Sequence, residues 1–286
     1  MRGLSLSGGG IKAAAHIGAL KAFEEEKIKF DCVSGASSGS IIATMYALGY
    51  SSDEMWKLFK KYYKKIKYVE WKQVIKMILG LIFTRRLVID GLNSGKVIEK
   101  IINEICKKSH VKNINEIKMT LMISMVDLQK GTVYIASSQE KRKVLQDNIK
   151  YISDIPIATA VRASCSFPVV FSPCKFDGLQ LIDGGTRENL PWKGLKEYGA
   201  DEVYGIAFDT ILEKNQCCKN MIEVAARAME LQGRELANYE KEGIDHLITI
   251  CLKKVALLDS SQIDELYKMG YEETKKQLNL LKKSTK

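Results

Sequence analysis

Twice within its first 50 residues, the chain runs from a strand-like segment through small residues into a helix-like segment. Residues 3–7 alternate as a short β-strand does and stop at Gly8-Gly9-Gly10, and residues 11–27 then carry their apolar side chains on one helical face. Residues 30–33 form a second strand-like run, and residues 41–48 form a second helix-like run. Because parallel strands joined by helices are covered on both faces, this pattern favours an α/β fold with a mostly parallel sheet.

The rest of the chain continues this alternation. Residues 121–126 and 132–136 flank Gln129-Lys130-Gly131 as the two strands of an expected hairpin. Further strands are expected at residues 179–182, 203–208 and 247–250, and further helices at residues 95–106, 221–239 and 261–281. No internal repeat, glycine-serine linker or low-complexity tract divides the sequence, so we expect residues 1–286 to form one domain.

The charge balance bears on partners. Lysine and arginine number 44 against 34 aspartate and glutamate, which gives a net charge of +10. Such a charge favours contact with anionic surfaces, although a general bias toward lysine would produce the same number. Zinc-finger spacings and RNA-binding aromatic strands are absent from the sequence, so an anionic membrane is a better expected partner than nucleic acid.

Other sequence features bear on location and cofactors. The longest apolar run, residues 77–83, is far shorter than the roughly 20 residues of a membrane-spanning helix, so membrane contact would be peripheral. No apolar signal segment follows Met1, and the seven cysteines are scattered and odd in number, which favours a cytoplasmic chain with reduced thiols. No Cys-x-x-Cys pair is present, and we expect neither a metal nor an organic cofactor.

The segment Gly35-Ala36-Ser37-Ser38-Gly39 lies between the second strand and the second helix. Gly-x-Ser-x-Gly in this context is typical of a nucleophile elbow, in which the serine occupies a strained turn and its neighbours are small because strand and helix lie close together. The pattern alone also occurs by chance, so the flanking strand and helix are what make it informative. We predict that Ser37 is a nucleophile, that Gly35 and Gly39 support its turn, and that the following helix N-terminus faces developing negative charge.

The segment Gly8-Gly9-Gly10-Ile11-Lys12, called the glycine loop below, lies at the first strand-to-helix turn. Residues without a Cβ let backbone N–H groups approach a ligand, so the loop is a candidate oxyanion hole. A P-loop would need Gly-x-x-x-x-Gly-Lys-Ser/Thr, and a dinucleotide fingerprint would need glycine at Ala13, so both phosphate-binding interpretations are weak. A plain tight turn is the simplest alternative.

Asp183-Gly184-Gly185 follows the apolar strand at residues 179–182. A carboxylate at the C-terminal end of a strand lies where open α/β sheets place their sites, which makes Asp183 a candidate site residue with Gly184 and Gly185 in support. An Asp-Gly pair is also an ordinary turn, so its significance depends on the other two motifs.

Taken in this order and context, the three motifs resemble the signature blocks of the patatin-like phospholipases. Residues 163–168 and 171–173 resemble the family's segment before the aspartate, and Asn189-Leu190-Pro191 resembles the segment after it. The resemblance covers about residues 3–210, while residues 211–286 carry no motif of the family. It implies a three-layer α/β/α fold, which the strands and helices of residues 211–286 would complete.

The resemblance also implies a mechanism. Ser37 would attack an ester carbonyl, and Asp183 would take its proton directly in a Ser-Asp dyad without a histidine. Lys12, at the family's Arg/Lys position, would add positive charge to an oxyanion hole. Ala13 departs from the glycine common in the family, which bears on the shape of the loop. The N–H groups that would bind the oxyanion are those of Gly9, Gly10 and Ile11.

A Ser-His-Asp triad is the rival interpretation from the residues alone. The order Ser37, Asp183, His246 is that of the α/β-hydrolases. Only three histidines occur, and each has an ordinary structural explanation: His16 falls in the first expected helix, His110 lies in a polar stretch before a strand, and His246 adjoins an apolar strand. We favour a strand-end or packing role for His246 over a role as base.

Residues 53–86 interleave aromatic and apolar side chains with lysines and end in Arg85-Arg86. A helical stretch over residues 53–83 would suit an interfacial helix or lid that contacts acyl chains. A solvated amphipathic cap is an equal alternative, because aromatic rings at helical spacing often pack internally. Residues 87–92 resemble a segment found after such a region in bacterial patatin-like proteins.

These observations favour a serine lipid acyl hydrolase of the phospholipase A type that works through an acyl-Ser37 intermediate. Its expected partner is a lipid or acyl-ester substrate. Two alternatives stay open: a soluble carboxylesterase or acyltransferase with the same dyad, and a catalytically silent protein that binds a membrane or a partner.

Overall fold

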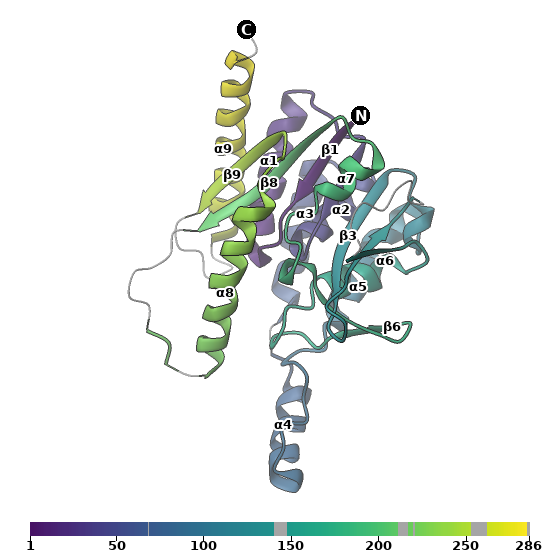
Figure 1. Ribbon diagram of the computed structural model, residues 1–286, viewed down its shortest axis with the longest axis vertical. Helices are drawn as coiled ribbons and strands as arrows, with labels where there is room; N and C mark the ends of the chain where they lie inside the picture. The colour runs from purple at the N-terminus through teal and green to yellow at the C-terminus, as the bar shows by residue number, and fades with distance from the viewer. Residues whose placement is uncertain (68, 140–147, 211–216, 220, 253–261, 285–286) are drawn as a thin grey trace.

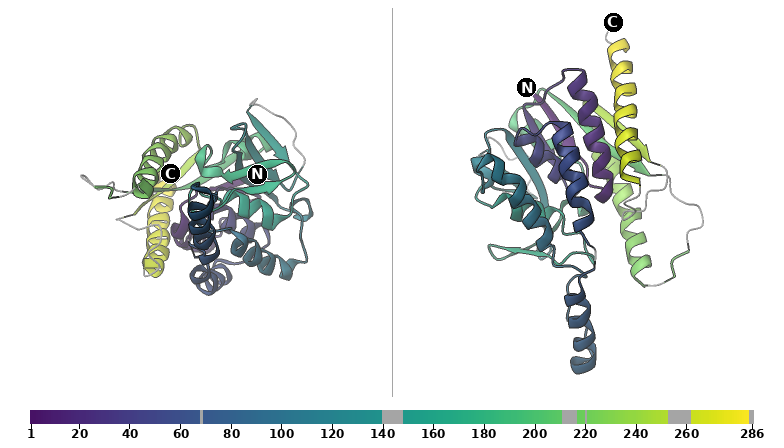
Figure 2. Two further views of the ribbon diagram at one scale, coloured as in Figure 1. Left: turned by 90° about the horizontal axis from the view of Figure 1, so that it is seen from below. Right: turned by 180° about the vertical axis from the view of Figure 1, so that it is seen from behind.

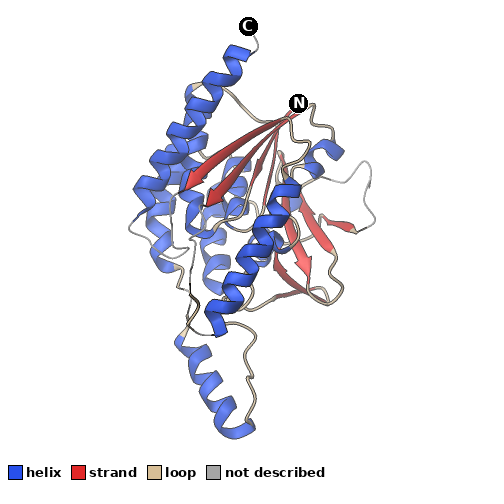
Figure 3. Ribbon diagram, turned by 60° about the vertical axis from the view of Figure 1, so that its left-hand side comes forward, coloured by secondary structure: helices blue, strands red, loops and turns tan. Residues whose placement is uncertain are grey.

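The computed structural model describes residues 1–67, 69–139, 148–210, 217–219, 221–252 and 262–284. A central sheet lies between two layers of helices, which confirms the expected three-layer α/β/α class (Figure 1, Figure 3). The strands are β1 (Arg2–Leu6), β2 (Cys32–Gly35), β3 (Thr120–Asp127), β4 (Val133–Ser137), β5 (Ile149–Ile152), β6 (Cys174–Phe176), β7 (Leu179–Asp183), β8 (Glu202–Thr210) and β9 (His246–Leu252). The α-helices are α1 (Ala13–Glu25), α2 (Ser38–Ala47), α3 (Ser52–Tyr62), α4 (Trp71–Thr84), α5 (Lys96–Cys106), α6 (Ile157–Ser164), α7 (Lys193–Tyr198), α8 (Met221–Glu240) and α9 (Ile263–Ser284). The 3-10 turns are η1 (Gly10–Lys12), η2 (Tyr63–Lys65), η3 (Lys107–Ser109), η4 (Ile114–Glu116) and η5 (Gly184–Thr186).

The sheet is mostly parallel, as the alternation of strands and helices predicts. Its main path runs β5-β4-β3-β2-β1-β8-β9, and every neighbouring pair along that path is parallel except the expected hairpin β3–β4. The strands β6 and β7 lie off this path, and β7 pairs antiparallel with β3. The short elements β5, β6, α6 and α7 are absent from the sequence-based expectation.

Side chains of each strand alternate between two cores. Leu4, Leu6 and Val33 join the larger core, which the helices α1, α2, α3, α5, α6 and α9 cover. Cys32 and Val203 point to a smaller core on the other face, which residues 190–200, including α7, cover. Figure 2 shows the larger helical layer from behind, with α9 running along α1.

Two glycines let α1 and α9 approach closely. A Cβ at Gly18 would collide with the backbone carbonyl of Tyr267, and a Cβ at Gly270 would collide with that of Ala15. The helix that ends the described chain therefore contacts the first α-helix backbone to backbone.

The helical stretch expected over residues 53–83 is interrupted. α3 begins at a capping box between Ser51 and Glu54 and buries Met55 and Tyr62 on its inner side. A 3-10 turn follows, and α4 then projects away from the rest of the molecule (Figure 1). Within the described ranges, every helix lacks the combination of length and apolar character needed to cross a bilayer.

Candidate functional site

Ser37 occupies a strained turn between β2 and α2. Its backbone angles are φ 49° and ψ −129°, in a region that residues with a side chain rarely adopt. Both flanking glycines are required by close packing: a Cβ on Gly35 would lie 2.6 Å from the carbonyl carbon of Gly39, and a Cβ on Gly39 would lie 2.6 Å from Ser7 O. The turn has the geometry of a nucleophile elbow.

The end of α6 holds this turn in place. The N–H of Ser37 donates to Ser164 Oγ at 2.8 Å, and Ser40 Oγ donates to Ser37 O at 2.6 Å. Cys165 lies beside them, and its pKa is raised by burial and by the charge of Asp183. Residues 163–168 stood out in the sequence only as a stretch, so the separate contacts of Ser164 and Cys165 are a structural finding.

The sheet register brings Asp183 to the level of Ser37. β2 ends at Gly35, which pairs with Ile123 of β3, and β7 pairs Asp183 with Met125, two residues further along β3. Because β4 occupies the other edge of β3 over the same residues, β7 lies on the edge that β2 occupies and meets β2 end to end. Asp183 thus lies at the C-terminal end of its strand, as expected, and that strand runs antiparallel to β3, so that its end meets the end of β2.

Burial controls the charge of Asp183. Asp183 is 3% exposed, and burial raises the pKa of its carboxyl to about 7, while hydrogen bonding by the Ser37 hydroxyl and by the N–H of Gly185 acts in the opposite direction. Gly185 donates to Oδ1 at 2.8 Å, whereas Oδ2 has no hydrogen-bond partner among the described residues. A carboxyl with one uncommitted oxygen and a pKa near neutrality can accept a proton from a neighbouring hydroxyl.

The glycine loop touches the serine turn. A Cβ on Gly8 would lie 2.9 Å from the Cβ of Ser37, so the two backbones are in close contact. The N–H of Gly8 donates to Asn189, at 3.0 Å to Oδ1 and 3.3 Å to the backbone oxygen. The N–H of Gly8 is thus already engaged by Asn189, and the inclusion of Gly8 in the oxyanion hole stays a prediction.

The N–H groups that follow are differently placed. Gly10 has a positive φ of 61° and opens η1, and the first N–H groups of a helix lack acceptors within it. In the described part of the chain, the N–H groups of Gly9, Gly10 and Ile11 have no acceptor. Lys12 closes η1 and donates its own N–H to Gly9 O at 3.2 Å.

A buried histidine supports the loop from behind. His16 of α1 donates from Nε2 to Ser7 O at 2.8 Å, and its ring lies 4.5 Å from that of Phe208. Phe208 in turn fills the space where a side chain on Gly9 would stand. Burial lowers the pKa of His16 to about 4, so the ring is neutral near pH 7 and acts through packing and one hydrogen bond.

Asn189 connects three segments around the site. Its Oδ1 accepts from Gly8, its N–H donates to Glu240 Oε1 at 2.6 Å, and Leu190 donates to the other carboxylate oxygen at 3.2 Å. Oδ1 also adjoins Gly185, where a Cβ would lie 2.8 Å from it. Asn189 had a sequence signal in its resemblance to a family segment, whereas Glu240, at the end of α8, had none.

A cavity of about 150 Å³ opens on the α8 side of the glycine loop. Residues that line it include Gly8, Lys12, Asn189, Phe208, Arg234 and Glu240. Ser37 and Asp183 lie outside its wall. Among the described residues, no group of His, Cys, Asp and Glu side chains is arranged to hold a metal ion.

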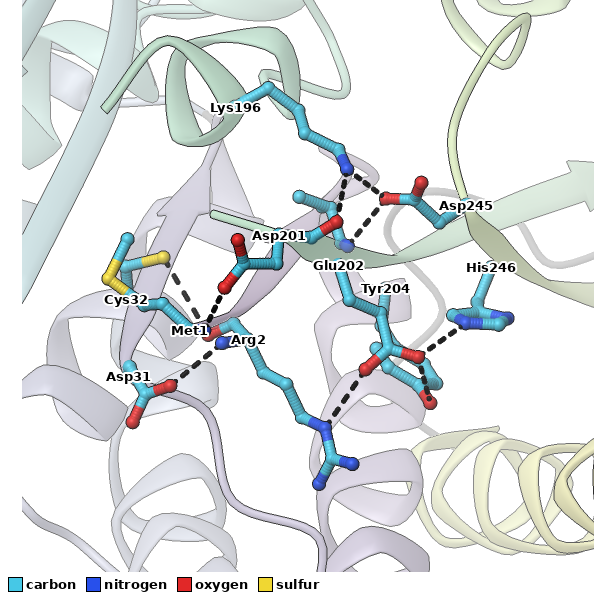
Figure 4. A network of polar contacts seen from close by, with 11 residues as sticks. Met1, Arg2, Asp31, Cys32, Lys196, Asp201, Glu202, Tyr204, Asp245 and His246 are labelled. Carbon is cyan, nitrogen blue, oxygen red and sulfur yellow. Dashed lines mark hydrogen bonds and ion pairs between the residues drawn. The ribbon is translucent and has the colours of Figure 1, made fainter. Parts of the chain in front are cut away.

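His246 lies at the opposite end of the strands from Ser37. It starts β9, contacts Glu202 Oε1 at 2.7 Å and stacks on Tyr204 at 4.4 Å between ring centroids (Figure 4). The sheet register places it level with Val33, four residues before Ser37 and three strands away. That offset is about 13 Å along the strands and about 14 Å across them, so the two side chains do not meet.

Comparison with known proteins points in the same direction as the motifs. Residues 4–196 match the family described as Patatin-like phospholipase. The uncharacterized protein YqhO of Bacillus subtilis is 32% identical over 199 residues, which cover 67% of this chain and 66% of that protein. The lysophospholipase NTE1 of Lodderomyces elongisporus is 26% identical over 204 residues, which cover 71% of this chain and 12% of that protein.

A solved structure shares the fold. VipD from Legionella pneumophila superimposes with a TM-score of 0.56 at 18% identity, over 97% of this chain and 66% of VipD. The matched part of this chain thus spans just under two thirds of YqhO and about an eighth of NTE1.

Proposed function

The chain belongs to the patatin-like phospholipase family, and from that membership we propose that it hydrolyses carboxylic esters of acyl lipids with Ser37 as nucleophile and Asp183 as base. The observation that carries the proposal is the juxtaposition of a strained serine with an aspartate that is 3% exposed, has a pKa of about 7 and keeps one carboxyl oxygen uncommitted. A phospholipase A-type reaction, in which a fatty acyl chain leaves a glycerol backbone, is the specific form we propose.

In the proposed first half-reaction, Ser37 Oγ attacks the ester carbonyl carbon while its proton passes to Asp183 Oδ2. The tetrahedral intermediate collapses, the ester C–O bond breaks, and the leaving alkoxide takes the proton from Asp183. An acyl-Ser37 ester remains. In the second half-reaction, water gives a proton to Asp183 and its hydroxyl to the acyl carbon. Collapse breaks the bond between the acyl carbon and Ser37 Oγ, releases the fatty acid and returns the proton from Asp183 to Ser37 Oγ.

Backbone amides support the charge that develops on the carbonyl oxygen. We assign this role to the N–H groups of Gly9, Gly10 and Ile11, which have no acceptor among the described residues. The N-terminus of α2, which begins directly after Ser37, adds a favourable dipole. Lys12 is assigned a supporting electrostatic role at the end of the same loop.

The pKa of Asp183 suits a base at neutral pH. A base is most effective when its pKa lies near the working pH, because it is then largely ionised and still accepts a proton readily. With a pKa of about 7, Asp183 meets that condition, whereas an exposed aspartate would be a weaker base.

The test is fatty acid release from vesicles of phosphatidylcholine and phosphatidylglycerol. Ser37→Ala and Asp183→Asn are expected to lower the rate at least about 1000-fold, and His246→Ala, as the matched control, is expected to retain it. Release by the Ser37→Ala variant at the wild-type rate would contradict the proposal. Cleavage of a soluble p-nitrophenyl ester without release from vesicles would leave the dyad in place and make the protein a soluble esterase.

A further inference from the structure

α4 and the segment that returns from it form an arm that stands apart from the sheet and its helices. Residues 71–91, called the α4 arm, leave the fold at Glu70 and return at Leu92, where the N–H of Glu70 donates to Leu92 O at 2.9 Å. The returning segment lies along the helix, because a Cβ on Gly80 would lie 3.1 Å from Arg86 O and would collide with Val88. Figure 1 and the right-hand view of Figure 2 show the arm standing away from the rest of the molecule.

The surface of this arm is strongly apolar. Trp71 is 80% exposed, Ile82 66% and Phe83 79%. Other large apolar side chains exposed along the arm are Ile75, Ile78, Leu79, Leu81 and Leu87. At the helical rotation of about 100° per residue, the exposed apolar positions of α4 spread over more than half of its circumference. A soluble surface rarely carries so continuous an apolar patch unless it meets an apolar partner.

The charges of the arm identify the partner. Residues 71–89 contain no aspartate or glutamate, and the cations among them are Lys72, Lys76, Arg85 and Arg86. The one carboxylate of the arm, Asp90, lies at its base and accepts a hydrogen bond from Ser172 Oγ at 2.7 Å. An apolar helix surface with basic and no acidic side chains is complementary to a bilayer that carries anionic head groups. A protein groove would cover one face of α4, whereas lipid acyl chains can surround the wider apolar arc described above.

The base of the arm is tied to the segment that holds the candidate site. The N–H groups of Leu92 and Asn93 donate to Val169 O at 3.1 Å and to Val170 O at 2.8 Å. The same segment, a few residues earlier, provides Ser164 Oγ for the N–H of Ser37 and Ser166 O for the N–H of Asp183. Binding through the arm would therefore orient this end of the sheet relative to the bound surface.

A buried arginine fixes the connection. Arg162, 7% exposed, donates from one guanidinium nitrogen to Ser94 O at 2.7 Å and to Ser172 O at 2.9 Å. These two oxygens belong to the two segments that meet at the base of the arm. The arm is thus anchored on a hydrogen-bonded base.

We propose that the α4 arm inserts its apolar side chains into the interface of an anionic lipid bilayer and holds the Ser37 end of the sheet against that surface. The inference goes beyond the proposed hydrolysis, because binding of this kind requires neither Ser37 nor Asp183 as a reacting group.

Binding is measured with the full chain as Ser37→Ala, so that hydrolysis cannot alter the vesicles, by sedimentation with vesicles of equal phosphatidylcholine and phosphatidylglycerol. The added change Ile82→Asp with Phe83→Asp is expected to weaken binding at least roughly 100-fold, since two side chains can no longer enter the apolar layer. Asn279→Asp with Leu280→Asp is the matched control, because it also adds two carboxylates and both side chains are exposed on α9, away from the arm. The control is expected to bind as the parent does.

A second variant tests the charge without touching the apolar surface. Lys76→Gln with Arg86→Gln is expected to weaken binding to the anionic vesicles by roughly 30-fold and to change binding to pure phosphatidylcholine little. Insertion of Trp71 into the bilayer is measured by fluorescence quenching with brominated lipids. The quenched part of the tryptophan fluorescence should be absent from the Trp71→Phe variant.

Two results would overturn the inference. One is unchanged vesicle binding by the Ile82→Asp, Phe83→Asp variant, with its thermal melt confirming that it is folded. The other is a parent protein that is a dimer in sedimentation velocity and an Ile82→Asp, Phe83→Asp variant that is a monomer but binds vesicles equally well. That result would identify the arm as a contact between copies of the chain. Neither result depends on whether the wild type releases fatty acid.

Discussion

Ionisation of the buried Asp183 lowers the free energy of unfolding as the pH rises, and replacing this residue should remove that effect. Burial raises the pKa of this carboxyl from 3.8 to about 7. In the unfolded chain it ionises from about pH 4 upward, whereas in the folded protein it stays largely protonated until about pH 7. Its contribution to stability is therefore complete below its unfolded pKa and is lost as the pH rises through its folded pKa.

The size of the loss follows from the shift. One pKa unit corresponds to about 1.36 kcal/mol, so the loss is about 1–2 kcal/mol at pH 5 and on the order of 4 kcal/mol at pH 8. Asp183→Asn keeps an oxygen that can accept from the N–H of Gly185 and carries no charge at either pH. We expect the variant to be more stable than the wild type by these amounts, while its lipid hydrolysis is lost.

The assay is urea unfolding of both proteins at pH 5 and pH 8, with the exposed Glu272→Gln as a control for charge removal. Burial also raises the pKa of Glu188 to about 8 and that of Glu240 to about 7, so the pH profile of the wild type alone would mix several groups. The difference between wild type and variant isolates Asp183. A gain of equal size at both pH values, or a variant less stable at pH 8, would refute the reasoning.

Four further outcomes are expected. Gly39→Ala should lower the free energy of unfolding by more than about 3 kcal/mol, because its Cβ would press on the carbonyls before the glycine loop, whereas Gly233→Ala, with open space around it, should not be destabilising in urea unfolding. Asn189→Ala should lower kcat roughly 10-fold or more in steady-state kinetics with little change in KM, because the N–H of Gly8 loses its side-chain acceptor. The rate constant kcat/KM should rise with pH through about 7, since only ionised Asp183 accepts a proton. His246→Ala should lose at most about 1 kcal/mol in thermal unfolding, because its contact with Glu202 is partly exposed.

The sequence predicts best the parts of the molecule whose causes are local. Both strand–turn–helix units at the start of the chain are visible because glycines and apolar periodicity lie next to each other in the sequence. The turn at Ser37 is visible for the same reason, since Gly35 and Gly39 report the close contact of strand and helix directly.

The parts that sequence reasoning misses depend on distant segments. The direction of β7 is decided by its pairing with β3, more than 50 residues earlier, and nothing within residues 179–183 reveals it. The contact of Glu240 with the backbone of Asn189 likewise joins a helix end to a loop 51 residues away. The break between α3 and α4 is not apparent from the sequence, because aromatic residues and lysines occur in both helices.

The end-to-end meeting of β2 and β7 has a consequence for how such a protein could change. Ser37 and Asp183 are both positioned by one neighbour, β3, so their spacing is set in whole residues of register. Insertions in the loops between them would leave that spacing intact. A shift of β7 by a single residue would turn the aspartate to the opposite face of the sheet, because side chains alternate along a strand. Loop insertions should therefore leave the distance between Ser37 and Asp183 unchanged, whereas a register shift would change that distance only in steps of a whole residue.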